Sequence, residues 1–263
     1  MLKELTKGDW LDILGLPESR IPGVLIVRGT RNLSSQYRAM LPYFENVVEV
    51  GAPNGIVEDV LIGDVGGRAV GFACAYGASM ASEVVHIFGV LGTRAVVQIG
   101  NCGALADDLG AGDLFVAERA YCGEGAARYY KPGAAWAEAS PNLLRSRTLS
   151  ALQPGECRSG AIYTTAALFA EGEADVERWY RDGFAAVDME TAATYAVAEH
   201  FGMDRVSILY GFDNPRRREH LLVSNAEKDV RRAAGSDRMR QLAFDLAAEI
   251  GAGREPEAGQ AAC

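Results

Sequence analysis

The sequence predicts a single α/β domain built around a largely parallel β-sheet. A short apolar run at Val24–Val27 ends in Arg28 and Gly29, as a buried strand does before a turn. An amphipathic stretch at Ser79–Gly92 is followed at once by a second apolar run, Ala95–Ile99. Helix, short turn and strand in this order indicate a crossover connection onto a parallel sheet.

The other elements follow in order along the chain. Gly66 and Gly67 lie between the runs Val57–Gly63 and Arg68–Cys74, which is typical of a β-hairpin. Gly92 is a suitable C-terminal residue for the helix before it. Further strands are predicted at Asp113–Ala120, Gly160–Tyr163, Phe184–Val187 and Val206–Tyr210, and further helices at Met189–His200 and Glu227–Ile250.

Domain organisation is simple. No repeat or linker divides the chain, so residues 1–250 are expected to form one domain. The segment Gly251–Cys263 is rich in Gly, Ala, Pro and Glu, and we expect a disordered tail there.

Composition restricts the class of function. A formal net charge of -9 argues against a protein that binds nucleic acid or anionic membranes. No segment is long and apolar enough to span a membrane, and the N-terminus lacks the pattern of a secretory signal, which predicts a cytoplasmic protein. Five cysteines without metal-type spacing and only three histidines predict free thiols and no metal site. The expected partner is a small molecule.

Ligands of such sheets bind beyond the carboxyl ends of the strands, so the strand-end segments carry the candidate residues. The segment Gly100-Asn101-Cys102-Gly103 is predicted to be a loop whose glycines let a ligand approach the backbone. An ordinary tight turn is equally consistent with it.

Two acidic segments are further candidates. Glu190 can accept hydrogen bonds from two vicinal sugar hydroxyls, and Met189 offers an apolar surface, whereas Asp188 is interpreted as a helix cap. Asp213 follows an apolar run, and partial burial would raise its pKa so that it can protonate a leaving group. The alternative interpretation of Asp213 is a turn residue before Asn214-Pro215. The following Arg216–Arg218 is expected to be a solvated run, with a lid over the site as the alternative.

In their order along the chain, four segments resemble the nucleoside phosphorylase superfamily, of the purine nucleoside phosphorylase and uridine phosphorylase type. The resemblance covers about Gly23 to Ile250. The segments are Val97–Leu105, Gly112–Ala117, Thr164–Phe169 and Val187–Ala193.

The resemblance implies a three-layer α/β/α fold around a mixed, partly barrel-like sheet. It also implies a homo-oligomer, from dimer to hexamer, and an enzyme that needs no metal or organic cofactor, with inorganic phosphate as a possible co-substrate. It further implies Asp213 as the catalytic acid and Met189 and Glu190 as the sugar-binding pair. The remaining implied residues are Phe169, Thr165, Cys102 and Gly103 on the base side, and Gly29, Arg31, Gln98 and Asn101 on the phosphate or water side.

The sequence departs from the family pattern on the phosphate side. Gln98 and Asn101 stand where the family has Arg and Ser or Thr, and Gly29-Thr30-Arg31 replaces its Gly-Asp-Pro loop. Phosphate requires fixed cationic donors, and Arg suits it best. Arg28 or Arg31 can substitute, or water can be the nucleophile.

The predicted function is cleavage of the N-glycosidic bond of a purine-type nucleoside. Phosphorolysis is preferred, and hydrolysis is the alternative because Gln98 is neutral. A catalytically inactive nucleoside-binding protein is the third possibility. The segment Ala170–Ala174 lacks the Gln and Arg pair of uridine-specific relatives, which favours a purine over uracil.

Overall fold

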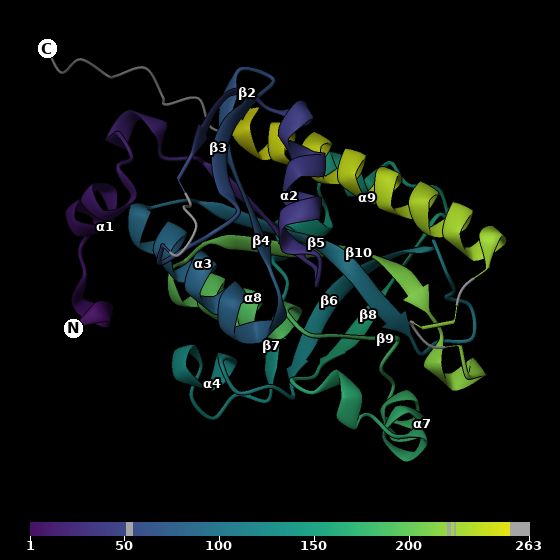
Figure 1. Ribbon diagram of the computed structural model, residues 1–263. Helices are drawn as coiled ribbons and strands as arrows, with labels where there is room; N and C mark the ends of the chain where they lie inside the picture. The colour runs from purple at the N-terminus through teal and green to yellow at the C-terminus, as the bar shows by residue number, and fades with distance from the viewer. Residues whose placement is uncertain (51–54, 220–221, 224, 253–263) are drawn as a thin grey trace, which may run out of the picture.

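One mixed β-sheet connects the elements of the chain (Figure 1). The computed structural model describes residues 1–50, 55–219, 222–223 and 225–252. Its strands are β1 (Val24–Gly29), β2 (Glu45–Glu49), β3 (Val60–Val65), β4 (Arg68–Ala75), β5 (Ala95–Ala104), β6 (Leu114–Cys122), β7 (Trp136–Glu138), β8 (Cys157–Thr164), β9 (Ala186–Asp188) and β10 (Asp204–Asp213). Its α-helices are α1 (Lys7–Leu14), α2 (Leu33–Met40), α3 (Gly77–Leu91), α4 (Ala127–Tyr130), α5 (Pro141–Leu144), α6 (Arg147–Ser150), α7 (Glu173–Arg181), α8 (Thr191–His200) and α9 (Ala226–Ala252).

The sheet is partly closed. Its strand order is β10-β6-β8-β9-β5-β1-β4-β3-β2, and β10 also pairs with β5. Strands β5, β10, β6, β8 and β9 therefore form a ring, from which β1, β4, β3 and β2 extend as an open sheet. Parallel pairs at β1–β4, β1–β5 and β5–β10 occur beside antiparallel ones at β3–β4 and β6–β10. The predicted mixed, partly barrel-like sheet is confirmed.

Most predicted elements lie where the apolar periodicity indicates. Strands β3 and β4 form the predicted hairpin, and Gly66 and Gly67 between them have φ of 56° and 74°. Residues with a side chain rarely adopt these angles, so both glycines are needed in the turn. The helix predicted at Ser79–Gly92 is α3, and it ends at Gly92 with φ of 93°.

The loop predicted at Gly100–Gly103 and the end of the strand predicted at Val206–Tyr210 are both wrong. Both belong to strands, because β5 continues to Ala104 and β10 to Asp213, with Leu209 opposite Gly100 and Gly211 opposite Cys102. A side chain at Gly100 would come within 2.9 Å of the Gly29 carbonyl oxygen. The glycines therefore permit close strand packing instead of a turn.

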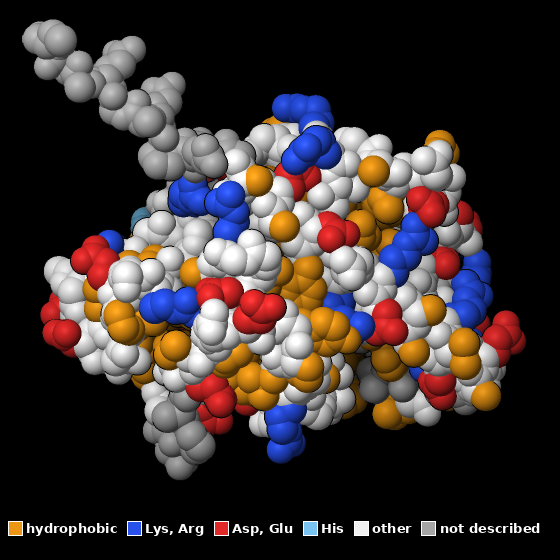
Figure 2. All heavy atoms as spheres, turned by 90° about the horizontal axis from the view of Figure 1, so that it is seen from above, with side chains coloured by type: hydrophobic (Ala, Val, Ile, Leu, Met, Phe, Trp, Pro, Cys, Tyr) orange, Lys and Arg blue, Asp and Glu red, His pale blue; other side chains and the backbone are white. Residues whose placement is uncertain are grey.

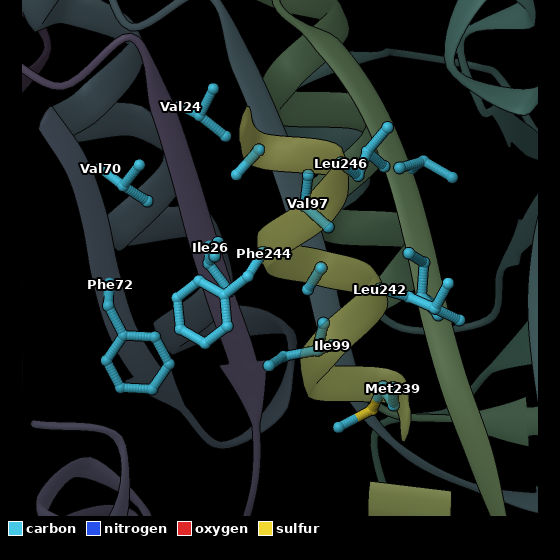
Figure 3. Packing of buried hydrophobic residues seen from close by; sticks show 14 of the residues in the cluster. Val24, Ile26, Val70, Phe72, Val97, Ile99, Met239, Leu242, Phe244 and Leu246 are labelled. Carbon is cyan, nitrogen blue, oxygen red and sulfur yellow. The ribbon is translucent and has the colours of Figure 1, made fainter. Parts of the chain in front are cut away.

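Helices cover both faces of the sheet, which gives the three predicted layers. Helices α3 and α8 lie on one face, and α9 and α2 on the other (Figure 1). Helix α8 is buried along almost its whole length, since its small side chains let it fit between α3 and the sheet. Figure 3 shows the apolar side of α9 packed on the face of the sheet opposite to α3 and α8. The residues in this cluster are Met239, Leu242, Phe244 and Leu246 of α9 and Ile26, Phe72, Val97 and Ile99 of the sheet.

Several elements were not predicted. Strand β2 is mostly exposed and β7 has three residues, so neither has the apolar signature of a buried strand. Helices α1, α2 and α4 to α7 are short. Helix α9 continues through Gly251 and Ala252, and the rest of the predicted tail, residues 253–263, lies outside the described residues.

The surface carries charges of both signs. On the face shown in Figure 2, Lys and Arg side chains are interspersed with Asp and Glu rather than gathered into one basic patch. In the described ranges, no helix combines the length and the apolar composition needed to cross a membrane.

We expect Gly235→Ala to destabilise the protein by about 1–3 kcal/mol, although alanine favours helices by about 1 kcal/mol. Gly235 lies in α9, and a Cβ there would come within 2.8 Å of the Gly112 Cα and still closer to its carbonyl oxygen. Backbone cannot move aside as a flexible side chain does.

Urea unfolding measures this effect, with Gly8→Ala as the control. In α1 a Cβ at Gly8 has only the Thr6 hydroxyl nearby, at 3.7 Å, so this variant should be stabilised. Equal stabilisation of both variants would contradict close packing of α9 on this loop.

Candidate active site

Glu190 lies at the carboxyl ends of the central strands, between β9 and α8. Its Oε1 accepts a hydrogen bond of 2.7 Å from the backbone amide of Gly77, the first residue of α3. A Cβ at Gly29, the last residue of β1, would lie 2.8 Å from its Oε2. The absence of a side chain at Gly29 thus makes room for this carboxylate, and the structure brings these two predicted site residues together.

Glu190 is a buried acid, with 5% of its surface exposed. Burial, together with the nearby charge of Asp188, raises its pKa to about 8, although the Gly77 amide acts in the opposite direction. Each hydrogen-bond donor that reaches this buried carboxyl group lowers its pKa, because the donor stabilises the ionised form.

Asp188 organises the residues around Glu190. It accepts hydrogen bonds from the Thr164 hydroxyl of β8 (2.8 Å), from the Thr191 amide of α8 (2.8 Å) and from Nε2 of Gln98 in β5 (3.2 Å). Burial raises the pKa of Asp188. The hydrogen bonds that its carboxylate accepts act in the opposite direction, and the bond from the Thr191 hydroxyl has the largest effect among them. The interpretation of Asp188 as a cap of the following helix is confirmed.

Gln98 and Asn101 lie in different environments, although both were assigned to the phosphate or water side. Gln98 is fully buried and directed at Asp188, and in the described part of the chain its Oε1 has no hydrogen-bond partner. Asn101 is exposed and lies opposite Tyr210 in the pairing of β5 with β10. Of the two, only Asn101 is open to a ligand in solvent.

Gly103 connects the two acidic segments. It pairs with Val187 of β9 on one side and with Asp213 of β10 on the other. A Cβ at Gly103 would lie 3.0 Å from Cγ1 of Val187 and 3.5 Å from Oδ1 of Asp213. Because Val187 is three residues before Glu190, the two candidate carboxylates belong to one edge of the sheet. Asp213 is half-buried.

The other predicted base-side residues differ in exposure. Cys102 is buried, and burial raises the pKa of its thiol well above the usual value. Thr165 is buried too, and its amide donates to the Asp188 carbonyl at 2.8 Å, so it belongs to the scaffold. Met189 is half-buried next to Glu190, whereas Phe169 is 80% exposed.

Phe169 lies at an open rim together with Arg31. The Arg31 guanidinium carbon is 5.4 Å from the centre of the Phe169 ring and 4.7 Å from that of Tyr76, whose hydroxyl it also contacts. This arrangement brings the loop after β1 to the segment after β8. A planar base or sugar can be covered by these side chains.

Sequence reasoning missed the role of Glu171. Its Oε1 is buried and, among the described residues, accepts no hydrogen bond. Burial, and then the charge of Asp213, raise its pKa to about 7. An acid two residues after the candidate base-stacking Phe169 was the available signal, but burial of its oxygen could not be read from the sequence.

The prediction of a solvated run is wrong for Arg216. Its side chain is only 17% exposed, and it donates to the Leu105 carbonyl and to Asp107 Oδ1, each at 2.8 Å. Its guanidinium also lies over the Tyr180 ring at 3.3 Å. Arg216 thereby fixes the segment after Asp213 to the end of β5 and to α7, since its long stem can be covered while its head is paired.

The candidate site lies at the strand ends of a partly closed sheet, which is where α/β proteins of this kind bind small ligands. The family model of the phosphorylase superfamily matches residues 33–250, and the chain belongs to this superfamily. Members are pentosyltransferases, which are the phosphorylases, or N-glycosyl hydrolases, which are the nucleosidases. The predicted family and enzyme class are confirmed.

Sequence relatives support this assignment. The DeoD-type purine nucleoside phosphorylase of Geobacillus sp. (strain WCH70) is 28% identical over 172 residues, which are 65% of this chain and 69% of that protein. The DeoD-type enzyme of Myxococcus xanthus (strain DK1622) is 27% identical over 169 residues, 64% and 67% of the two chains.

Solved structures share the fold. Uridine phosphorylase from Vibrio fischeri ES114 superimposes with a TM-score of 0.75 at 22% identity, covering 88% of this chain and 94% of that one. The MTA/SAH nucleosidase of Streptococcus pneumoniae gives a TM-score of 0.66 at 18% identity, covering 86% and 99%. The predicted α/β/α fold class is therefore confirmed, while the substrate is not defined by these similarities.

We expect Glu190→Gln to change how stability depends on pH. A folded-state pKa of about 8, against 4.5 for the ordinary side chain, means that the native protein holds a proton that the unfolded chain releases. The stability that depends on this proton is therefore lost as the pH rises from about 4.5 to about 8. Glutamine stays neutral, so the variant should gain stability relative to wild type across this window, by up to a few kcal/mol at about 1.4 kcal/mol per pKa unit.

Chemical denaturation at pH 5 and pH 8.5 measures the difference. Glu83→Gln, which removes an exposed carboxylate from α3, serves as the matched control. A stability difference between Glu190→Gln and wild type that stays constant with pH would refute the assignment of a buried, protonated acid.

Proposed function

We propose that this protein cleaves the N-glycosidic bond of a purine nucleoside, with inorganic phosphate as the second substrate. The observation that carries the proposal is that Gly103 pairs with Asp213 on one side and, on the other, with Val187, which precedes Glu190 by three residues at the same edge of the sheet. One carboxyl group is then available for the sugar and the other for the base.

Glu190 is suited to the sugar hydroxyls. The 2′ and 3′ hydroxyls donate hydrogen bonds to its carboxylate oxygens, and Met189 covers an apolar face of the ring. The hydroxyls stabilise the ionised carboxylate and so overcome the burial that raises its pKa. The ribose is thereby fixed with its anomeric carbon next to the backbone of Gly29.

Asp213 is suited to the leaving base. The electron pair of the bond between C1′ and the base nitrogen moves into the purine, and Asp213 gives its proton to a ring nitrogen so that the base leaves neutral. Positive charge develops on the sugar ring, and a phosphate oxygen then forms the new bond to C1′. Glu171 lies near this acid, because the charge of Asp213 contributes to raising the pKa of Glu171.

Hydrolysis is the second candidate, and Gln98 favours it. The Gln98 side chain is neutral, and its amide donates a hydrogen bond to Asp188 inside the protein. It therefore supplies no cation for phosphate. Water would then attack C1′, and ribose instead of ribose 1-phosphate would be the product. The homo-oligomer and the cytoplasmic location stay predictions.

The product of nucleoside cleavage distinguishes these candidates. Inosine, guanosine, adenosine, methylthioadenosine and uridine are incubated with and without phosphate, and base and sugar products are separated. Ribose 1-phosphate from purine nucleosides supports the proposal. Free ribose formed equally well without phosphate selects hydrolysis, and cleavage of uridine alone would overturn purine specificity. Tight nucleoside binding without any product would select the inactive binding protein.

We expect Asp213→Asn to lower kcat on inosine by about 10²–10⁴-fold, the usual effect of losing a general acid. A nucleoside methylated at N7 carries a positive base that leaves as a neutral molecule without protonation, so its cleavage should be nearly unchanged.

Steady-state kinetics on the two substrates provides the measurement, with Asp182→Asn as an exposed control beyond α7. Equal losses on the normal and the N7-methylated nucleoside would mean that Asp213 does not act as an acid.

A further inference from the structure

The strand that carries Asp213 is irregular just before this residue. In the pairing of β10 with β5, Gly211 lies opposite Cys102. The next pair joins Asp213 to Gly103, so Phe212 is an extra residue in β10. Such a β-bulge bends the strand and redirects the side chain that follows it. Because a bulge interrupts the regular pairing, contacts outside the β5–β10 pair must decide where Asp213 points.

The bulge is held from α9. The Phe212 carbonyl accepts a hydrogen bond of 2.7 Å from Nε of Arg232, and the guanidinium carbon of Arg232 lies 3.9 Å from the centre of the Phe212 ring. Arg232 is itself buried, with 6% of its surface exposed. The residue before Asp213 is therefore fixed by a buried side chain, and the residue after it is Asn214.

Asn214 is also buried, with 1% of its surface exposed. Its Nδ2 donates to the carbonyl oxygens of Ala106 at 3.3 Å and of Leu109 at 3.2 Å. Its Oδ1 accepts a hydrogen bond of 3.3 Å from the backbone amide of Arg217. Both donor positions and the acceptor of this side chain are thus used inside the protein, which restricts a buried amide to one orientation.

The loop after β5, which accepts these bonds, is joined to the strand before Glu190. The backbone amides of Leu105 and Ala106 both donate to the Ala185 carbonyl, at 2.9 and 3.0 Å. Ala185 immediately precedes β9, which ends two residues before Glu190. Asn214 therefore connects the chain after the candidate acid to the frame that also carries the sugar-binding candidate.

We infer that Asn214 is a positioning residue for Asp213. Its two bonds to the loop after β5 hold the backbone next to Asp213 in the frame that carries Glu190. A general acid must lie within hydrogen-bond reach of the atom that it protonates, so its placement relative to the bound sugar decides its efficiency. Asn214 is buried and acts only through Asp213. The inference rests on the proposed function, in which Asp213 protonates the leaving base.

Asn214→Ser separates this role from that of a helix cap. Serine can still accept a hydrogen bond from the Arg217 amide, as N-cap residues do, but it has no N–H donors and cannot reach both carbonyl oxygens. We expect kcat on the best purine nucleoside to fall about ten- to hundredfold, since a small displacement of a reacting group has an effect of this size. KM should change less than kcat.

The same nucleoside methylated at N7 distinguishes positioning from a loss of folded protein. Its cleavage needs no proton from Asp213, so Asn214→Ser should keep kcat on it within about threefold of wild type. A fraction of unfolded protein lowers both rates equally and leaves their ratio unchanged. Asn214→Ala, which also lacks the cap, should show the same selective loss.

Asn142→Ala is the matched control. Asn142 is exposed, and its Nδ2 donates at 2.8 Å to Asp204, the first residue of β10, at the end of the strand far from Asp213. This variant removes one asparagine hydrogen bond from the same strand and should change neither rate.

A double-mutant cycle provides a second measurement. Added to Asp213→Asn, Asn214→Ser should cause little further loss on the normal nucleoside, because the acid that it positions is already gone. Independent, additive losses would overturn the inference. So would an equal loss on both nucleosides in Asn214→Ser, or failure of both Asn214 variants to fold, which would identify a structural residue alone.

These data also separate the inference from the proposed function. If Asp213→Asn slows the normal nucleoside selectively and Asn214→Ser does not, the acid stands and the positioning role is refuted. If Asp213→Asn slows both nucleosides equally, the acid role in the proposed function is refuted, and the positioning role with it.

Discussion

The buried carboxylate of Asp188 determines how the site is assembled. Its donors come from β5, β8 and the first turn of α8, so one side chain fixes the junction of β9 and α8 against two neighbouring strands. Glu190 follows two residues later and its own amide donates to Asp188 at 3.3 Å. The position of Glu190 is therefore set by a hydrogen-bond network centred on the buried Asp188.

The same network decides where the charge lies. Hydroxyl, amide and backbone donors surround the Asp188 carboxylate, whereas the Glu190 carboxylate accepts from backbone amides such as that of Gly77. These donors favour the ionised form of Asp188 against its burial, whereas burial and the nearby charge of Asp188 raise the pKa of Glu190 to about 8. In the proposed function, sugar hydroxyls supply further donors to Glu190, so that binding of the sugar and ionisation of Glu190 are coupled. An arginine in place of Gln98 would neutralise Asp188 and weaken this coupling.

Much of the framework was predictable, because its signal is apolar periodicity. The runs at β1 and β5, the helix α3 and the buried side of α9 appear directly in the sequence. The ends of β5 and β10 were not predictable, since glycine favours turns as well as close strand packing, and only the partner strand decides between them. Glu190 and Asp213 could be selected by residue type and position. The burial of Arg216 depends on its tertiary neighbours, and so does the burial of the Glu171 Oε1 atom without a hydrogen-bond partner among the described residues. The local sequence does not encode these neighbours.

The two faces of the sheet separate charges that would otherwise cancel. Arg28 and Gly29 are consecutive strand residues, so Arg28 is directed towards α9 while Gly29 faces Glu190. A cation on the same face as Glu190 would pair with that carboxylate, lower its pKa and compete with the sugar hydroxyls. Gly29, which has no side chain, separates the Arg28 cation on the α9 face from the Glu190 carboxylate on the other face. Each group therefore keeps its own hydrogen-bond partners, Ser236 for Arg28 and the Gly77 amide for Glu190.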